Sequence, residues 1–205
     1  MRRAYTYVSY EDPNKLHKEE DMFHFEIQEG KTLHALTISE VDTKNKYSEE
    51  YYNCTGVAAV GVDKETGENI SLLTHQNPRF FFPNDKYGDI VKSALIERLQ
   101  KLKERSVSGT VDIVIIGGKH TIELRQEEYD NSISALKDIV TEVFDFSPVV
   151  QSPKFVPQDD TEIYLDTENR RIYMVQPPAN YINSNAPFDA RDLPNEQEKW
   201  RVERW

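Results

Sequence analysis

Cys54 is the only cysteine in the chain and the residue best suited to act as a nucleophile. It directly precedes the small, apolar run Thr55–Val62, which predicts a buried strand with the thiol at its entry. His75 follows 21 positions later, at the end of the next predicted strand. A neighbouring imidazole can take the proton of a thiol and leave a thiolate, the species that attacks amide carbonyls in cysteine hydrolases. Cys54 and His75 therefore predict a nucleophilic site.

The strand pair around these two residues explains why they would meet. The runs 55–62 and Asn69–Leu73 flank a short acidic turn, in which Gly67 suits a left-handed position. In an antiparallel hairpin the entry of one strand lies beside the exit of the other. The hairpin therefore predicts that Cys54 and His75 lie side by side.

A third group is needed to orient the imidazole, and the chain offers upstream hydroxyls at Ser48 and at Thr43. The amide of Cys54 or of Gly56 can contribute to an oxyanion hole. A structural interpretation stands beside the catalytic one, because a single cysteine at a strand end is commonly a small buried hydrophobe. The sequence Thr-His-Gln-Asn-Pro around His75 also fits an ordinary turn. The residues alone leave both interpretations open.

Helices and a further strand are predicted on either side of this hairpin. Apolar residues at helical spacing predict one helix within Asp85–Arg105 and a second, capped by residue 131 or 132, that runs to about residue 144. The β-branched run Val111–Ile116 predicts a central strand between them. The aromatic run Phe80–Phe82 is expected to fill the core ahead of the first helix.

The fold class follows from the order of these elements. Two more hairpins are predicted, at Phe23–Ile38 and at Glu162–Val175. Strands and helices interleave without strict alternation, which predicts a single α/β domain over residues 1–176. We expect a sandwich with a mixed, largely antiparallel sheet, several hairpins and two main helices. Residues 177–205 are poor in aliphatic side chains and predict a C-terminal tail.

Composition narrows the range of partners. A chain of 205 residues with 38% hydrophobic residues can bury one core, and its formal net charge of -11 opposes binding to nucleic acid or to anionic lipid. No apolar run is long enough to span a bilayer or to act as a signal peptide, and the single cysteine forms no internal disulfide, so a cytoplasmic location is expected. The spacing of His17, His24 and His34 matches no metal-ligand pattern, which predicts a solvated acidic face instead.

The order of the motifs resembles the CheD family of chemoreceptor glutamine deamidases over about residues 43–175. The likeness consists of the cysteine and histidine on successive strands and of three motifs that follow them. These are Lys86-Tyr87-Gly88-Asp89 at a helix start, Ile115-Ile116-Gly117-Gly118 at a strand end, and the closing hairpin from Tyr164-Leu165-Asp166-Thr167 to Arg171-Ile172-Tyr173-Met174. The turns around Cys54 and His75 differ from the family's, which places the likeness in the wider cysteine deamidase superfamily, with toxin deamidases and an N-terminal asparagine amidohydrolase.

The resemblance implies a reaction that needs no cofactor and no metal. In the family a cysteine attacks the side-chain amide of a protein glutamine, a histidine is the base and an upstream threonine completes the triad. In this chain these roles fall to Cys54, His75 and, at the matching six-residue offset, Ser48. The implied function is a cysteine amidohydrolase that deamidates glutamine, or asparagine, on a protein through a thioester. The alternative is a noncatalytic protein-binding module on the same fold, which would use its acidic surface and Trp200 and Trp205.

Overall fold

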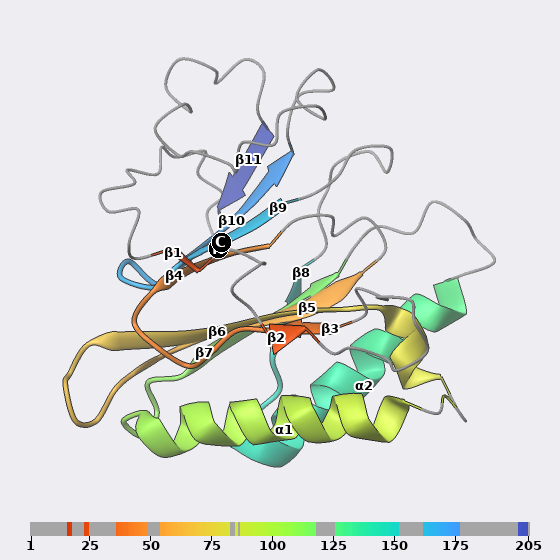
Figure 1. Cartoon of the computed structure of the whole chain (residues 1–205), viewed down its shortest axis with the longest axis horizontal. Helices are drawn as coiled ribbons and strands as arrows, with labels where there is room; N and C mark the ends of the chain where they lie inside the picture. The colour runs from red at the N-terminus through yellow and green to blue at the C-terminus, as the bar shows by residue number, and fades with distance from the viewer. Residues whose placement is uncertain are drawn as a thin grey trace.

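Three layers make up the fold (Figure 1). The computed structural model describes residues 16–17, 23–24, 36–48, 54–82, 85, 87–117, 126–151, 162–176 and 201–204. Two helices cover one face of a six-stranded sheet, and a five-stranded sheet lies on its other face. The arrangement confirms the predicted α/β sandwich with mixed, largely antiparallel pairing, and divides its strands between two sheets.

The six-stranded sheet contains the predicted central hairpin. Its strands, in spatial order, are β2 (Phe23–His24), β3 (Leu36–Ile38), β6 (Asn69–Gln76), β5 (Thr55–Val62), β7 (Asp112–Gly117) and β8 (Val149–Gln151). All neighbours are antiparallel except β7 and β8. The β5–β6 hairpin is confirmed, with Gly67 at a φ of 75° in its turn. The Phe23–Ile38 hairpin is confirmed at its paired ends, and its turn lies outside the described residues.

The five-stranded sheet consists of β1 (Leu16–His17), β4 (Asn45–Ser48), β9 (Glu162–Asp166), β10 (Arg171–Gln176) and β11 (Arg201–Arg204). The predicted hairpin at 162–175 is β9 and β10. β11 pairs with β10, so the sheet continues past the expected end of the domain at residue 176. Strand β11 has the sequence Arg-Val-Glu-Arg, whose single apolar residue does not predict a strand. It forms because the edge of β10 that is not paired with β9 offers backbone hydrogen-bond partners.

Helices α1 (Gly88–Arg105) and α2 (Gln126–Phe144) form the outer layer, and a 3₁₀ helix, η3 (Pro78–Phe81), leads into α1. Phe80 and Phe81 are buried in the helix-side core, as expected. The predicted start of the second helix is wrong, because α2 begins at Gln126 and Ser132 lies inside it. Among the helices that the structure describes, none combines the length and the apolar character needed to span a membrane.

Strand β5 sends alternate side chains into two cores. Val57 and Ala59 pack with the helices. Ala58 and Val60 pack instead with Leu165 and other residues of the five-stranded sheet. Burial on both faces explains why β5 is apolar from Gly56 to Val62 instead of alternating.

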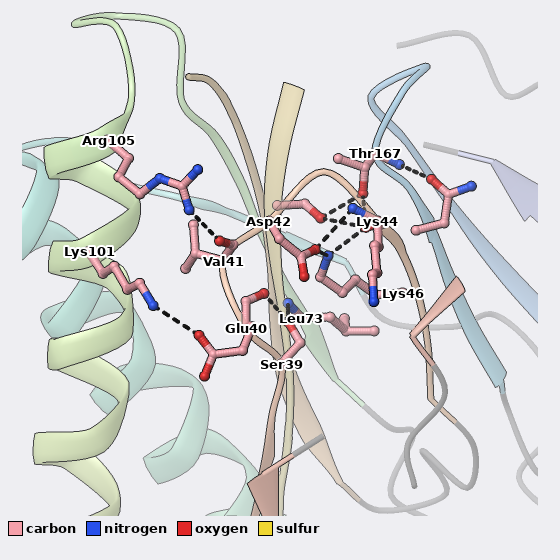
Figure 2. A network of polar contacts seen from close by, with 12 residues as sticks. Ser39, Glu40, Val41, Asp42, Lys44, Lys46, Leu73, Lys101, Arg105 and Thr167 are labelled. Atoms are coloured by element: carbon pink, nitrogen blue, oxygen red, sulfur yellow. Dashed lines mark hydrogen bonds and ion pairs between the residues drawn. The ribbon is translucent and has the colours of Figure 1, made fainter. Parts of the chain in front are cut away.

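The segment 39–44 crosses from β3 to β4 and is held from two sides at its start (Figure 2). From α1, the Arg105 guanidinium donates to the Val41 carbonyl at 2.6 Å. From β6, the Leu73 amide donates to Ser39 Oγ at 2.9 Å. The crossover is therefore anchored to the helix layer and to the six-stranded sheet before it reaches the other sheet.

The end of the crossover is tied to the turn between β9 and β10. Thr167 Oγ1 donates to the Lys44 carbonyl at 2.7 Å, and the Thr167 amide donates to Asn45 Oδ1 at 2.8 Å. The Ser71 and Thr167 hydroxyls lie 2.6 Å apart and bridge the two sheets. These hydrogen bonds fix the start of β4, the strand that ends at Ser48.

Lys46 on β4 is a fully buried cation. Its Nζ donates to Asp42 Oδ1 at 2.7 Å and to the Lys44 carbonyl at 2.5 Å. Burial lowers the pKa of Lys46 from its usual 10.5 to about 8, because the loss of hydration outweighs the attraction of the Asp42 carboxylate.

We expect the free energy of unfolding to rise between about pH 8 and pH 10.5. In this window the unfolded chain keeps the Lys46 proton that the folded chain has lost, so folding is favoured as the pH increases, by up to about 3 kcal/mol. Urea titrations at several pH values measure the effect. Lys46→Met, which replaces the buried ammonium by an apolar chain, should lack this rise. Equal slopes for the two proteins would show that Lys46 does not cause it.

Candidate active site

Ser48, the last residue of β4, and His75, near the end of β6, meet between the two sheets. Ser48 Oγ lies 3.1 Å from His75 Nδ1. Ser48 is fully buried, whereas His75 is half-buried. An Nδ1 proton can be donated to the hydroxyl oxygen, which leaves Nε2 as the unprotonated ring nitrogen. The contact suits a ring that acts as a base through Nε2.

Cys54 directly precedes β5 and is a half-buried free thiol. β5 pairs with β6 at Thr55 and Gln76, and the same register sets Gly56 opposite His75. Side chains alternate along a strand, so Gly56 and His75 share the face that is turned toward the five-stranded sheet. Cys54, one residue before β5, is expected on the same face because the alternation carries over to it. Because Gly56 has no side chain, β5 places none directly opposite the imidazole.

The second hydroxyl considered from the sequence, that of Thr43, lies elsewhere. Thr43 is exposed and lines a polar hollow with Gly67, which belongs to the β5–β6 turn. That turn is at the opposite end of the hairpin from Cys54. Of the two candidates, the structure brings only Ser48 to His75.

Four polar residues on the other face of the same strands form a buried group that the sequence pattern did not reveal. We call this group the α2-facing network; it consists of Ser132 on α2, Thr55 on β5, and Thr74 and Gln76 on β6. All four residues are fully buried. The network could have been identified from the sequence by the polar residues that occupy the buried face of otherwise apolar strands.

The α2-facing network is a continuous chain of hydrogen bonds. Thr55 Oγ1 and Ser132 Oγ lie 2.7 Å apart. Gln76 Nε2 donates to Thr55 Oγ1 at 3.4 Å, and Thr74 Oγ1 donates to Gln76 Oε1 at 2.9 Å. The network therefore connects both strands of the site to helix α2.

Comparison with known proteins adds no family to this geometry. No family model matches the chain, and no curated protein matches it. Within the described parts of the chain, His, Cys, Asp and Glu side chains do not gather in threes at any point where they could hold a metal ion. His34 lies outside the described residues, and the solvated acidic face predicted around His17, His24 and His34 stays a prediction.

Proposed function

We propose that the chain is a cysteine amidohydrolase that converts the side-chain amide of a glutamine, or of an asparagine, on a protein into the acid. The observation that carries the proposal is the 3.1 Å contact between Ser48 Oγ and His75 Nδ1. It supplies the orienting hydroxyl of a triad in which His75 is the base and Cys54 the nucleophile. The Cys54 thiol at the strand entry is half-buried, so it is not sealed inside the core. The resemblance to the cysteine deamidases points to the same reaction.

The first half of the reaction forms a thioester. His75 Nε2 takes the thiol proton, and the Cys54 sulfur attacks the amide carbon. The carbonyl oxygen becomes an oxyanion, for which a backbone amide beside the nucleophile is the natural donor. The carbon–nitrogen bond then breaks, and the proton held by His75 leaves with the nitrogen as ammonia.

The second half releases the acid. His75 takes a proton from a water molecule, whose oxygen attacks the thioester carbon. The carbon–sulfur bond breaks, and the proton returns to the Cys54 sulfur. One water is consumed and one ammonia is released for each amide, so the cycle needs neither a cofactor nor a redox partner.

Ser48→Ala is expected to slow the labelling of Cys54 by iodoacetamide at neutral pH about fivefold. The reason is the loss of one hydrogen bond, of about 1 kcal/mol, that holds the imidazole in its working orientation. Ser48→Thr, which keeps the hydroxyl, should restore most of the rate. Ser39→Ala is the matched control, because Ser39 Oγ also accepts a hydrogen bond from β6, at the Leu73 amide. Equal rates in Ser48→Ala and Ser39→Ala would contradict the role given to Ser48.

The direct test of the function is ammonia release from an unfolded protein rich in glutamine and asparagine, such as reduced and alkylated casein. The wild type is expected to release ammonia and to convert amides to acids at sites found by mass spectrometry. Cys54→Ala should do neither, because no thioester can form. A noncatalytic binding module would release no ammonia and would have a thiol whose reactivity does not depend on His75.

A further inference from the structure

The chain neighbours of Cys54 and His75 are members of the α2-facing network. Thr55 follows Cys54, and Thr74 and Gln76 flank His75. Their side chains point to the helix side, opposite to the face that carries the site. The network therefore holds the backbone immediately on each side of the proposed base and immediately after the proposed nucleophile.

The network also replaces a part of the strand pairing at this point. β5 and β6 pair at Thr55 and Gln76 and again from Ala58 onward in the same register. Between these points the Val57 amide donates to Thr74 Oγ1 at 2.9 Å. A side-chain hydroxyl thus stands where a regular antiparallel ladder has a backbone acceptor. That hydroxyl therefore links the two strands directly beside the site.

Thr74 is the member of the network that links β6 directly to the backbone of β5. Its hydroxyl accepts from the Val57 amide of β5 and donates to the Gln76 side chain of its own strand. From Gln76 the contacts continue through Thr55 to Ser132 on α2. Buried polar groups that are fully connected in this way hold a local geometry rigidly, because a displaced member loses a hydrogen bond that no water replaces.

We propose that the α2-facing network positions the site by fixing the separation of β5 and β6 where Cys54 faces His75. The inference rests on the proposed function, since it assumes that these two residues react together. In this scheme the four network residues are positioning residues. They act through the backbone, and Thr74 has the largest effect.

The test measures how strongly His75 accelerates iodoacetamide labelling of Cys54 in the full chain. The His75 effect is the ratio of the labelling rate of a protein to that of its His75→Ala counterpart. In the wild type it is expected to be at least about tenfold. In Thr74→Val, which keeps the shape but lacks the hydroxyl, it should fall below about twofold. Thr74→Ser restores the hydroxyl and should restore most of the effect.

Thr110→Val is the matched control. Thr110 Oγ1 also accepts a hydrogen bond from a β5 amide, that of Val62 at 3.1 Å, at the end of the strand remote from Cys54. Its removal should leave the His75 effect at the wild-type value. The proposal is overturned if Thr74→Val, shown to be folded by its unfolding transition, keeps the same His75 effect as Thr110→Val.

A second variant keeps the test decisive if Thr74→Val does not fold. Ser132→Ala removes only the connection to α2 and should lower the His75 effect by about half. An unchanged effect in Ser132→Ala would overturn the proposal in that case.

A separate readout distinguishes failure of the positioning role from failure of the proposed function. The ¹⁵N shifts of the His75 ring report the Ser48 contact whether or not the thiol reacts. They should move in Thr74→Val and stay in place in Thr110→Val. If the wild type has no His75 effect, the proposed function fails, and the ring shifts then decide the positioning role: shifts that do not move in Thr74→Val reject it.

Discussion

Replacing His75 by alanine is expected to slow iodoacetamide labelling of Cys54 at neutral pH by at least about tenfold. The thiolate is the reactive species, and in the proposed site His75 both accepts the thiol proton and, once charged, stabilises the thiolate beside it. The rate of the wild type should also exceed that of a free thiol model compound. Rates measured by mass spectrometry between pH 5 and pH 9 check both points.

His75→Asn provides the informative comparison. The asparagine amide can still donate to Ser48 Oγ but has no nitrogen that can serve as the base. It should therefore label as slowly as His75→Ala while remaining better folded. All three proteins should be labelled at the same rate in concentrated urea, where the thiol is equally exposed. A difference in native buffer then comes from the folded site and not from the thiol itself. A wild-type rate equal to that of His75→Ala in native buffer would remove the nucleophile and leave the binding-module alternative.

Gly88→Ala is expected to destabilise the fold by about 2–3 kcal/mol, although alanine is the better helix former. Gly88 is the first residue of α1, and a Cβ there would lie 2.6 Å from the carbonyl oxygen of Phe80 in η3. A backbone atom cannot move aside as a side chain can, so α1 and η3 must separate. Phe80 and its neighbour Phe81 are core residues, and their displacement exposes apolar surface.

Urea unfolding of Gly88→Ala measures this cost. Ser93→Ala, at an exposed position of the same helix, is the control and should change stability by no more than about 0.5 kcal/mol. A more stable Gly88→Ala would show that helix propensity outweighs the contact with Phe80. Because η3 follows β6 directly, the same variant should also reduce the His75 effect on Cys54 labelling.

The elements that the sequence predicts well are those with strong local signals. Strand β5 is apolar from Gly56 onward because both of its faces are buried, and Gly67 marks the turn that makes its partner strand antiparallel. That hairpin is sufficient to predict that Cys54 and His75 share one end of the sheet. Helix α1 is predicted correctly from the spacing of its apolar residues. The start of α2 was misplaced because Ser132 has the residue type of a helix cap, whereas its hydroxyl is hydrogen-bonded to Thr55.

The parts that were missed depend on contacts between distant segments. Strand β4 has the sequence Asn-Lys-Tyr-Ser, which carries no strand signal, and Lys46 is buried there because Asp42 and a carbonyl receive its ammonium. The meeting of Ser48 with His75 joins two sheets, and no local pattern encodes the docking of one sheet on another. Ser48 could be named from a resemblance in spacing, but its distance from the ring could not.

We expect the crossover at 39–44 to impose an order of assembly on the proposed site. Cys54 and His75 belong to one hairpin and can approach each other as soon as β5 and β6 pair, since few residues separate them. Ser48 arrives only when the five-stranded sheet docks, because β4 is delivered by a segment anchored to α1, to β6 and to the β9–β10 turn. In the proposed site, a refolding chain is therefore expected to bring the thiol and the imidazole together before Ser48 orients the ring. The labelling rate of Cys54, followed during refolding, can then distinguish formation of the β5–β6 hairpin from the later docking of the two sheets.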